Sequence, residues 1–347
     1  MAHHQVTLAE VAKHAKVSLA TASRVLNGST RQVSAELRER VLATARELGY
    51  LPNASAQALA RNTSSLVGLV VHDIADPYFS SIAAGVTRVA EEAGLIVVLG
   101  TTSREPEREL ALLSTLRAHR ARAVVLVGTR TTDDSATQRL AEEIKAFQAQ
   151  GGRVACVSQA HLPADTVVPA NALGAHDLAT SLAAQGHREF AVLAGPEKLL
   201  AARDRLDGFR AGLAEHGVEL AAHNVVHGAF TRDGGHAAMH ELLERGTGAK
   251  CVFAVNDVMA VGALAAVRER GLRSPEDVAV AGFDDIPTLS DLVPPLTTVR
   301  LPLEEIGERA ARLALEGDAP SEPRTVEVGA EVVLRDSTAV LGRPVLS

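Results

Sequence analysis

Residues 6–60 read VTLAEVAKHAKVSLATASRVLNGSTRQVSAELRERVLATARELGYLPNASAQALA. Thr7 and Glu10 have the Thr-x-x-Glu spacing of a capping box, in which each side chain bonds a free amide at the start of a helix. Ser18 is expected to cap a second helix over residues 19–26. The spacing of apolar residues in both segments predicts two short helices that bury one face each.

The segments around the second helix fix its ends. Residues 15–17 form a tight turn before it, and Asn27-Gly28 end it because both tolerate a left-handed backbone. Ser34 begins a third helix, which ends at Gly49. Two short helices separated by a turn of three or four residues are typical of a helix-turn-helix, whose second helix enters the major groove of DNA.

Charge is divided unevenly along the chain. Residues 1–62 contain eight Lys and Arg and four Glu, a net charge of +4, whereas the whole chain of 347 residues carries −7. The remaining residues therefore carry −11. A basic segment on an acidic body favours a module that binds phosphates, over a three-helix bundle without a nucleic-acid partner.

The N-terminal segment resembles the lactose-repressor family of bacterial transcription regulators. TLAEVAKHAKVSLATASRVLNG and ELGYLPNASAQALA carry the resemblance. It implies a helix-turn-helix head over residues 5–50, a hinge helix or linker over 51–63, and an effector-binding and dimerisation core over 64–347.

The same resemblance implies which residues meet DNA. The set is Thr7, Ser18, Leu19, Ala20, Thr21, Ser23, Arg24, Asn27, Ala56 and Leu59. Leu19 and Ala20 are apolar, so they are expected to touch thymine methyl groups, while Arg24 is the candidate for a hydrogen-bonded guanine contact. Thr21, Ser23 and Asn27 are expected to hold phosphates and set the register on DNA. In the hinge, Leu59 is expected to wedge into a base step of the minor groove and Ala56 to pack against a second copy.

Beyond the hinge, apolar runs such as SLVGLVVHD, AVVLVG and CVFAVN alternate with helical segments. This rhythm predicts parallel sheets covered on both faces, and its two cycles predict two doubly wound subdomains. The expected boundaries are 64–165 with 291–323 for the first subdomain, and 166–290 with 324–347 for the second. Crossings are expected near Asp165, Ser290 and Arg324, and the tail EVGAEVVLRDST is expected to add strands to the second subdomain.

The core resembles the same family's effector domain, which is built like a periplasmic sugar-binding protein; DPYFSSIAAGV, GHREFAVLAGP and VAVAGFDD match it. Ligands of such sheets bind beyond the carboxyl ends of the strands. The candidates there are Asp76, Tyr78, Phe79, Ser158, Gln159, Arg205, Phe230, Asn256, Asp284 and Arg300. Phe79 and Phe230 are expected to sandwich a sugar ring, with Arg205, Asn256 and Asp284 on its hydroxyls.

One departure from the sequence pattern of the family bears on the identity of the ligand. Ser158-Gln159 stand where ribose binders of this type have an acid and an arginine, which disfavours ribose but not sugars as a class. A nucleobase or nucleoside is the alternative effector. We expect a homodimer on a near-palindromic operator, because two heads related by a two-fold axis need two half-sites. Whether the effector releases DNA or promotes binding stays open.

Other classes of protein are disfavoured by what the sequence lacks. No signal peptide and no apolar run of membrane-spanning length is found, so a cytoplasmic protein without a membrane partner is expected, and a transporter's solute-binding protein is disfavoured. No phosphate-binding loop or nucleophile elbow occurs, so neither an enzyme nor a cofactor is expected. Cys156 and Cys251 lie in apolar runs and are expected to be buried free thiols, and no metal motif is found.

Overall fold

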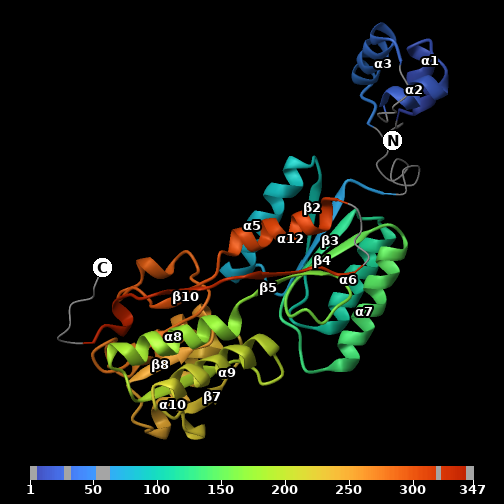
Figure 1. The fold of residues 1–347 in the computed structure, drawn as a ribbon. Coiled ribbons are helices and arrows are strands. Elements are labelled where there is room, and N and C mark those ends of the chain that lie inside the picture. Colours follow the sequence, from blue (N-terminus) through green and yellow to red (C-terminus); the bar gives the residue numbers. More distant parts are fainter. Residues whose placement is uncertain (1–5, 27–32, 52–62, 318–321, 341–347) are drawn as a thin grey trace. The chain divides into compact units, whose positions relative to one another are not determined.

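The computed structural model describes residues 6–26, 33–51, 63–317 and 322–340. The chain divides into two compact units, a head that ends at Ser65 and a core that begins at Leu66 (Figure 1). No helix in the described ranges is both long and apolar enough to cross a membrane.

The head consists of three helices, α1 (Leu8–His14), α2 (Leu19–Leu26) and α3 (Ala35–Glu47). The predicted capping box is present: the Glu10 amide donates to Thr7 Oγ1 at 3.3 Å, and the Thr7 amide donates to Glu10 Oε2 at 2.7 Å. The helices enclose a small apolar core of Val11, Ala12, Ala15, Ala22, Val25, Val41 and Ala45.

The first sheet of the core is a six-stranded parallel sheet with the order β11-β5-β4-β3-β1-β2. Its strands are β1 (Leu66–Val71), β2 (Ile96–Thr101), β3 (Ala123–Val127), β4 (Arg153–Val157), β5 (Asp165–Pro169) and β11 (Thr325–Val328). Its helices are α5 (Pro77–Glu92), α6 (Pro106–Ala118), α7 (Asp134–Ala149) and α12 (Leu303–Leu315). As Figure 1 shows, α5 and α12 cover one face of this sheet, and α6 and α7 cover the other.

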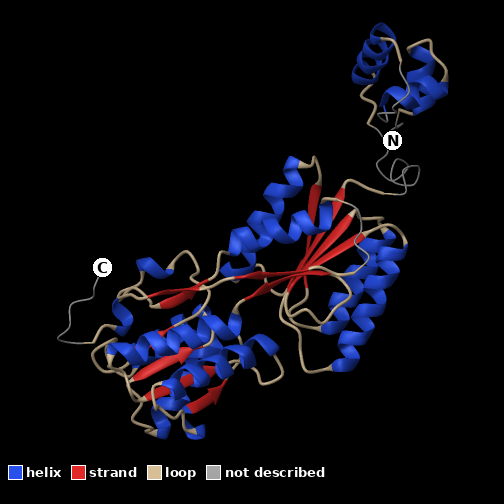
Figure 2. Ribbon diagram, in the orientation of Figure 1, coloured by secondary structure: helices blue, strands red, loops and turns tan. Residues whose placement is uncertain are grey.

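The second sheet is a four-stranded parallel sheet with the order β7-β6-β8-β9 (Figure 2). Its strands are β6 (Phe190–Ala194), β7 (Val225–His227), β8 (Cys251–Ala254) and β9 (Ala279–Ala281). Its helices are α8 (Asn171–Gln185), which packs on α9 (Leu200–Glu215), and α10 (Arg232–Arg245), which packs on α11 (Asp257–Glu269). The predicted class, a helical head followed by two doubly wound parallel α/β subdomains, is confirmed.

Three segments cross between the two sheets, each a few residues later in the chain than the sequence suggested. The first follows β5, the second follows β10 (Thr298–Arg300), and the third joins β11 to β12 (Glu331–Val333), which pairs antiparallel with β10. The sequence assigned β5 and β11 to the second subdomain, but both belong to the first sheet. No helix separates β4 from β5, so the strand–helix rhythm gave no sign that β5 continues the sheet of β4.

Candidate functional site

The second helix of the head presents its first residues outward. Leu19 is 54% exposed, although it is a leucine, and Ala20 beside it is also exposed. Ser18 Oγ accepts the Thr21 amide at 3.1 Å, as the sequence predicted for the helix cap. Arg24 is exposed, whereas the opposite side of α2 is buried in the head core. An exposed apolar residue at the start of a helix suits contact with base edges in a groove.

The other DNA-contacting candidates have different positions. Thr7 caps α1, and Thr21 and Ser23 are partly buried on α2. Asn27, Ala56 and Leu59 lie outside the described residues. The expected hinge wedge is therefore not tested by the structure.

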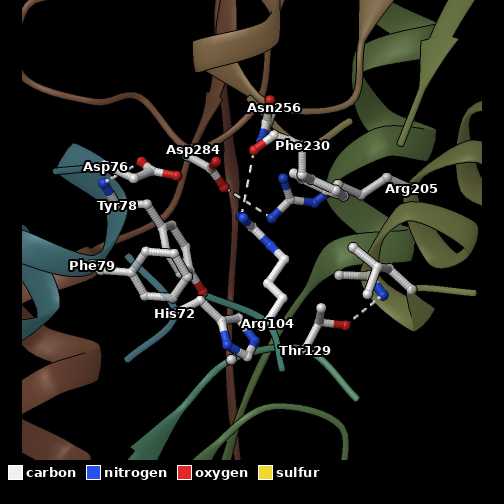
Figure 3. A pocket seen from close by; sticks show the side chains of 13 residues that line it. His72, Asp76, Tyr78, Phe79, Arg104, Thr129, Arg205, Phe230, Asn256 and Asp284 are labelled. Carbon is white, nitrogen blue, oxygen red and sulfur yellow. Dashed lines mark hydrogen bonds and ion pairs between the residues drawn. The ribbon is translucent and has the colours of Figure 1, made fainter. Parts of the chain in front are cut away.

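A cleft lies between the two sheets of the core, at the carboxyl ends of their strands (Figure 3). Its open space measures about 430 Å³, including its solvent-facing mouth. The residues that line it are His72, Asp76, Tyr78, Phe79, Arg104, Gly128, Thr129, Leu199, Ala201, Arg205, Phe230, Asn256 and Asp284. Seven of the ten predicted effector residues are among them.

Arg205, on α9, is 4% exposed and uses its guanidinium in three directions. Nε donates to Asn171 Oδ1 at 2.8 Å, Nη1 donates to the Val255 carbonyl at 2.7 Å, and Nη2 donates to Asp284 Oδ1 at 2.8 Å. Its fourth neighbour is the Phe283 ring, 3.9 Å from the guanidinium carbon to the ring centroid. Removing one partner of such a buried ion pair costs about 3–5 kcal/mol, because the other charge stays behind without compensation.

Asp284 is held in an unusual backbone conformation, with φ at 119°, which costs roughly 1–3 kcal/mol for a residue other than glycine. Its amide donates to the Val299 carbonyl at 2.8 Å, and its carbonyl accepts the Leu301 amide at 3.3 Å. These bonds aim the carboxyl group into the cleft. Burial raises the pKa of Asp284, but the guanidinium of Arg205, 2.8 Å from Oδ1, opposes that shift and stabilises the carboxylate.

Asn256 is positioned by the helix that follows it. Its Oδ1 accepts the Met259 amide at 3.0 Å as the N-cap of α11, so the Nδ2 group is the part of the amide left to meet a ligand. Asp76 caps α5 in the same manner, with its carboxylate on the Tyr78 amide at 3.0 Å. Burial raises the pKa of Asp76, while Arg104 opposes the shift.

The two phenyl rings are not equivalent. Phe79 is 4% exposed and meets Tyr78 and His72 edge to face, with centroid distances of 5.0 and 5.6 Å. Phe230 is half-buried, and the Arg104 guanidinium lies 5.8 Å from its centroid. Both phenyl rings line the cleft. Arg104, however, reaches toward Phe230 in the space where a sugar ring was expected to lie between the two phenyl rings (Figure 3).

Six of the lining residues were not in the predicted set, and three of these six carry polar side chains. Arg104, after β2, donates from Nη2 to the carbonyl of Phe230 at 3.4 Å and so connects the two walls. His72, after β1, bonds Thr102 Oγ1 through Nδ1 at 2.8 Å, and burial lowers its pKa to about 4. Thr129, after β3, accepts the Ala201 amide at 2.9 Å. All three follow strands of the first sheet, so their positions after apolar runs were the available signal.

Three predicted residues do not line the cleft. The Ser158 hydroxyl donates to the carbonyl of Gln159 at 2.9 Å. The Gln159 amide donates to Asp204 at 3.1 Å and so ties the first subdomain to α9. Arg300 is exposed and donates to Asp285 at 2.7 Å and to Glu331 at 3.2 Å. Ser158 and Gln159 follow β4, as predicted, and Arg300 is the last residue of β10, but all three side chains are used in contacts beside the cleft.

Comparison with known proteins identifies the family. Residues 7–53 match the family described as "Bacterial regulatory proteins, lacI family", and residues 179–338 match a "Periplasmic binding protein-like domain". The chain is 34% identical over 310 residues to the HTH-type transcriptional repressor CytR of Escherichia coli K12, which covers 89% of each chain. The chain therefore belongs to the LacI family of DNA-binding transcriptional regulators. These relatives are regulators of transcription and not enzymes.

Two solved structures are similar over nearly the whole chain. A Lac repressor dimer bound to operator and the anti-inducer ONPF is 28% identical, with a TM-score of 0.81, and the match covers 97% of this chain and 100% of that one. A complex of the transcriptional regulator CelR with cellobiose is 34% identical, with a TM-score of 0.69, and the match covers 96% and 100%.

A second buried carboxyl group beside the cleft makes the stability depend on pH. Asp257 is 0% exposed, and its carboxylate accepts the Thr298 hydroxyl at 2.7 Å and the Ile286 amide at 3.0 Å. Burial raises its pKa to about 7, so the folded chain holds a proton that the unfolded chain releases above its ordinary value of 3.8. The free energy of unfolding should therefore fall as pH rises from about 4 to 7, by at most about 1.4 kcal/mol per pH unit from this group.

Asp257→Asn should remove that dependence while keeping both hydrogen bonds, because an amide oxygen can accept from Ile286 and an amide NH₂ can donate to Thr298. Urea unfolding at about pH 5 and about pH 8 should show the variant gaining stability relative to wild type at the higher pH. A difference between the two proteins that does not change with pH would contradict the assignment.

Proposed function

We propose that this regulator is a repressor that binds a near-palindromic operator as a homodimer and responds to a sugar in the cleft of the core. The observation that carries the effector assignment is the group formed by Arg205, Asp284 and Asn256. It places a cationic donor, a carboxylate acceptor and an amide donor at one end of a cleft whose walls carry aromatic rings. Sugars need this combination, since each hydroxyl both donates and accepts and each ring has an apolar face.

The similar complex of CelR with cellobiose supports a polyhydroxylated ligand for a cleft of this kind. Arg104 supports the same assignment from the opposite wall. Its guanidinium lies near the Phe230 ring and burial lowers its pKa, so a ligand with acceptor oxygens would recover hydrogen bonds for a donor that has lost much of its water.

Asp284→Asn should weaken binding of the effector about 10- to 100-fold, because a hydrogen bond to a charged group contributes about 1.5–3 kcal/mol. Calorimetry against a panel of mono- and disaccharides and nucleosides measures this directly. Asp177→Asn, an exposed carboxylate on α8, is the matched control and should leave binding unchanged. Equal affinity of the Asp284 variant and wild type for the tightest ligand would remove Asp284 from the site. Preference for a nucleoside would overturn the sugar assignment but keep the cleft.

The head supports the DNA assignment through its net positive charge and through the outward Leu19 and Arg24 of α2. Arg24→Ala should cost about 1–3 kcal/mol at the operator and relax base preference at one position in each half-site. Selection of bound DNA from a random pool followed by fluorescence anisotropy measures both effects. Arg46→Ala, on α3, is the control, because its side chain is 73% exposed and pairs with Glu39. It should leave base preference unchanged. An unaltered preference in the Arg24 variant would contradict the assignment.

The homodimer is supported by the edge of the first sheet. β2 is an edge strand, and it exposes Ile96 by 61%, Val98 by 41% and Leu99 by 42%. An edge strand with exposed apolar residues is a surface that proteins normally cover. A second copy of this chain would cover it about a two-fold axis.

Ile96→Asp should therefore weaken the dimer at least tenfold, since burial of an isoleucine contributes about 1.5–3 kcal/mol and a two-fold axis removes it twice. Analytical ultracentrifugation over a concentration series gives the dissociation constant. Leu173→Asp on α8, where the leucine is also 61% exposed, is the matched control and should leave it unchanged. Equal dissociation constants for the two variants would show that β2 is not in the interface.

A further inference from the structure

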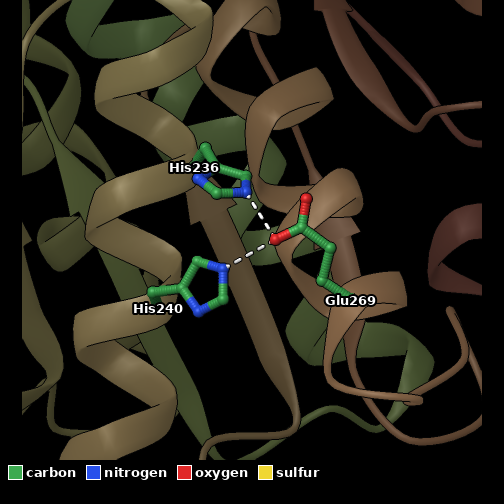
Figure 4. Close-up of side chains that lie close together, drawn as sticks. All are labelled: His236, His240 and Glu269. Atoms are coloured by element: carbon green, nitrogen blue, oxygen red, sulfur yellow. Dashed lines mark hydrogen bonds and ion pairs between the residues drawn. The ribbon is translucent and has the colours of Figure 1, made fainter.

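Two histidines and one carboxylate converge on the second subdomain, and none of the three lines the cleft (Figure 4). His236 and His240 are one turn apart on α10, and Glu269 is the last residue of α11. Both imidazole Nε2 atoms bond the same oxygen, Glu269 Oε2, at 2.9 Å for His236 and 3.0 Å for His240. The three potential ligand atoms all lie within 4.8 Å of one another.

The helices hold these groups in place without help from the cluster itself. A Cβ atom at Gly262 of α11 would overlap the Arg232 carbonyl of α10, and a Cβ at Gly235 would overlap the Met259 carbonyl. The two glycines therefore allow the helix axes to approach closely. This packing sets the spacing between the histidine pair and Glu269. A bound ion would therefore lose little free energy in ordering these side chains.

We propose that His236, His240 and Glu269 form a binding site for a divalent transition-metal ion, with zinc as the best match. Zinc takes imidazole nitrogen at about 2.0–2.1 Å and carboxylate oxygen at about 2.0–2.2 Å, usually with tetrahedral geometry. Ligand atoms around such an ion are roughly 3.3–3.5 Å apart. The two Nε2–Oε2 distances of 2.9 and 3.0 Å are slightly shorter than that, and the side chain of Glu269, which is 55% exposed, can withdraw to admit an ion. A fourth position stays open for water or for a donor from another molecule.

The position of the proton on His240 allows a metal ion to replace its hydrogen bond to Glu269. Arg270 donates from Nε to His240 Nδ1 at 3.3 Å, so the His240 proton lies on Nε2 and is donated to Glu269. Metal binding at Nε2 moves that proton to Nδ1, and Arg270 then turns toward Glu244, which it already bonds at 2.7 Å. Mg²⁺ and Ca²⁺ are disfavoured, since both prefer all-oxygen ligands.

The test is zinc titration of the full chain at neutral pH, in competition with a chromogenic chelator. His3 and His4, which are adjacent in the sequence, are replaced by alanine in every protein compared, so that they cannot account for the zinc binding. The parent should bind one zinc ion per chain, and His240→Gln and Glu269→Gln should each bind it at least about tenfold more weakly. His216→Gln, an exposed histidine at the end of α9, is the matched control and should match the parent.

Cobalt gives a second, independent measurement. The parent should develop the intense visible absorption of four-coordinate Co²⁺, which zinc should abolish, and His240→Gln should not develop it. Equal zinc affinity in the parent and both site variants, or only the weak spectrum of six-coordinate cobalt, would show that the cluster is a hydrogen-bonded fastening between α10 and α11 and no metal site.

Discussion

The buried pair of Arg205 and Asp284 is the interaction on which the core depends. Its guanidinium reaches Asn171 at the start of α8, directly after the first crossing segment. It also reaches Asp284, which follows β9 and pairs with Arg300 at the end of β10, where the second crossing begins. It also bonds the end of β8 through the Val255 carbonyl. One side chain therefore joins two of the three connections between the subdomains to the sheet that carries the cleft. Because the pair is almost without solvent, a ligand that competes for Asp284 changes the environment of both connections.

This arrangement links the two subdomains on either side of the cleft. Another ion pair, in which Arg324 bonds Asp165 at 2.6 Å, aligns the start of β11 with the start of β5, and the third connection leaves the other end of β11. The first sheet, whose strand β1 begins at the first residue of the core, receives all three connections. A ligand shifts the equilibrium between two arrangements of the subdomains only by as much as it binds one of them better. Arg104 and Gln159, which reach from the first subdomain to the second, are the contacts that such a shift would alter.

The sequence was sufficient for most of the fold and for the chemical core of the cleft. Apolar runs separated by helical segments predicted the parallel sheets, and their ends located Arg205, Asn256 and Asp284. β5 was assigned to the other subdomain because no helix separates it from β4, and β11 was assigned with it because the crossing was expected near Arg324, before β11, whereas it follows β11. Arg104 was missed because its partner lies 126 residues away in the sequence. Arg300 was expected to follow a strand, but it is the last residue of β10, which pairs with β12, and its side chain meets Asp285 and Glu331. Likewise, His236 and His240 show a helical spacing, but only the packing of α10 on α11 supplies Glu269.

The central claim is that occupation of the cleft and operator binding are coupled through the connections that Arg205 and Asp284 anchor. The most direct measurement is operator affinity, by fluorescence anisotropy at fixed salt, in the absence and presence of saturating effector, together with effector affinity in the absence and presence of operator. The account predicts that the two ratios are equal and between about 5- and 150-fold, because coupling between two binding sites is reciprocal. Operator affinity that is the same with and without bound effector would contradict it.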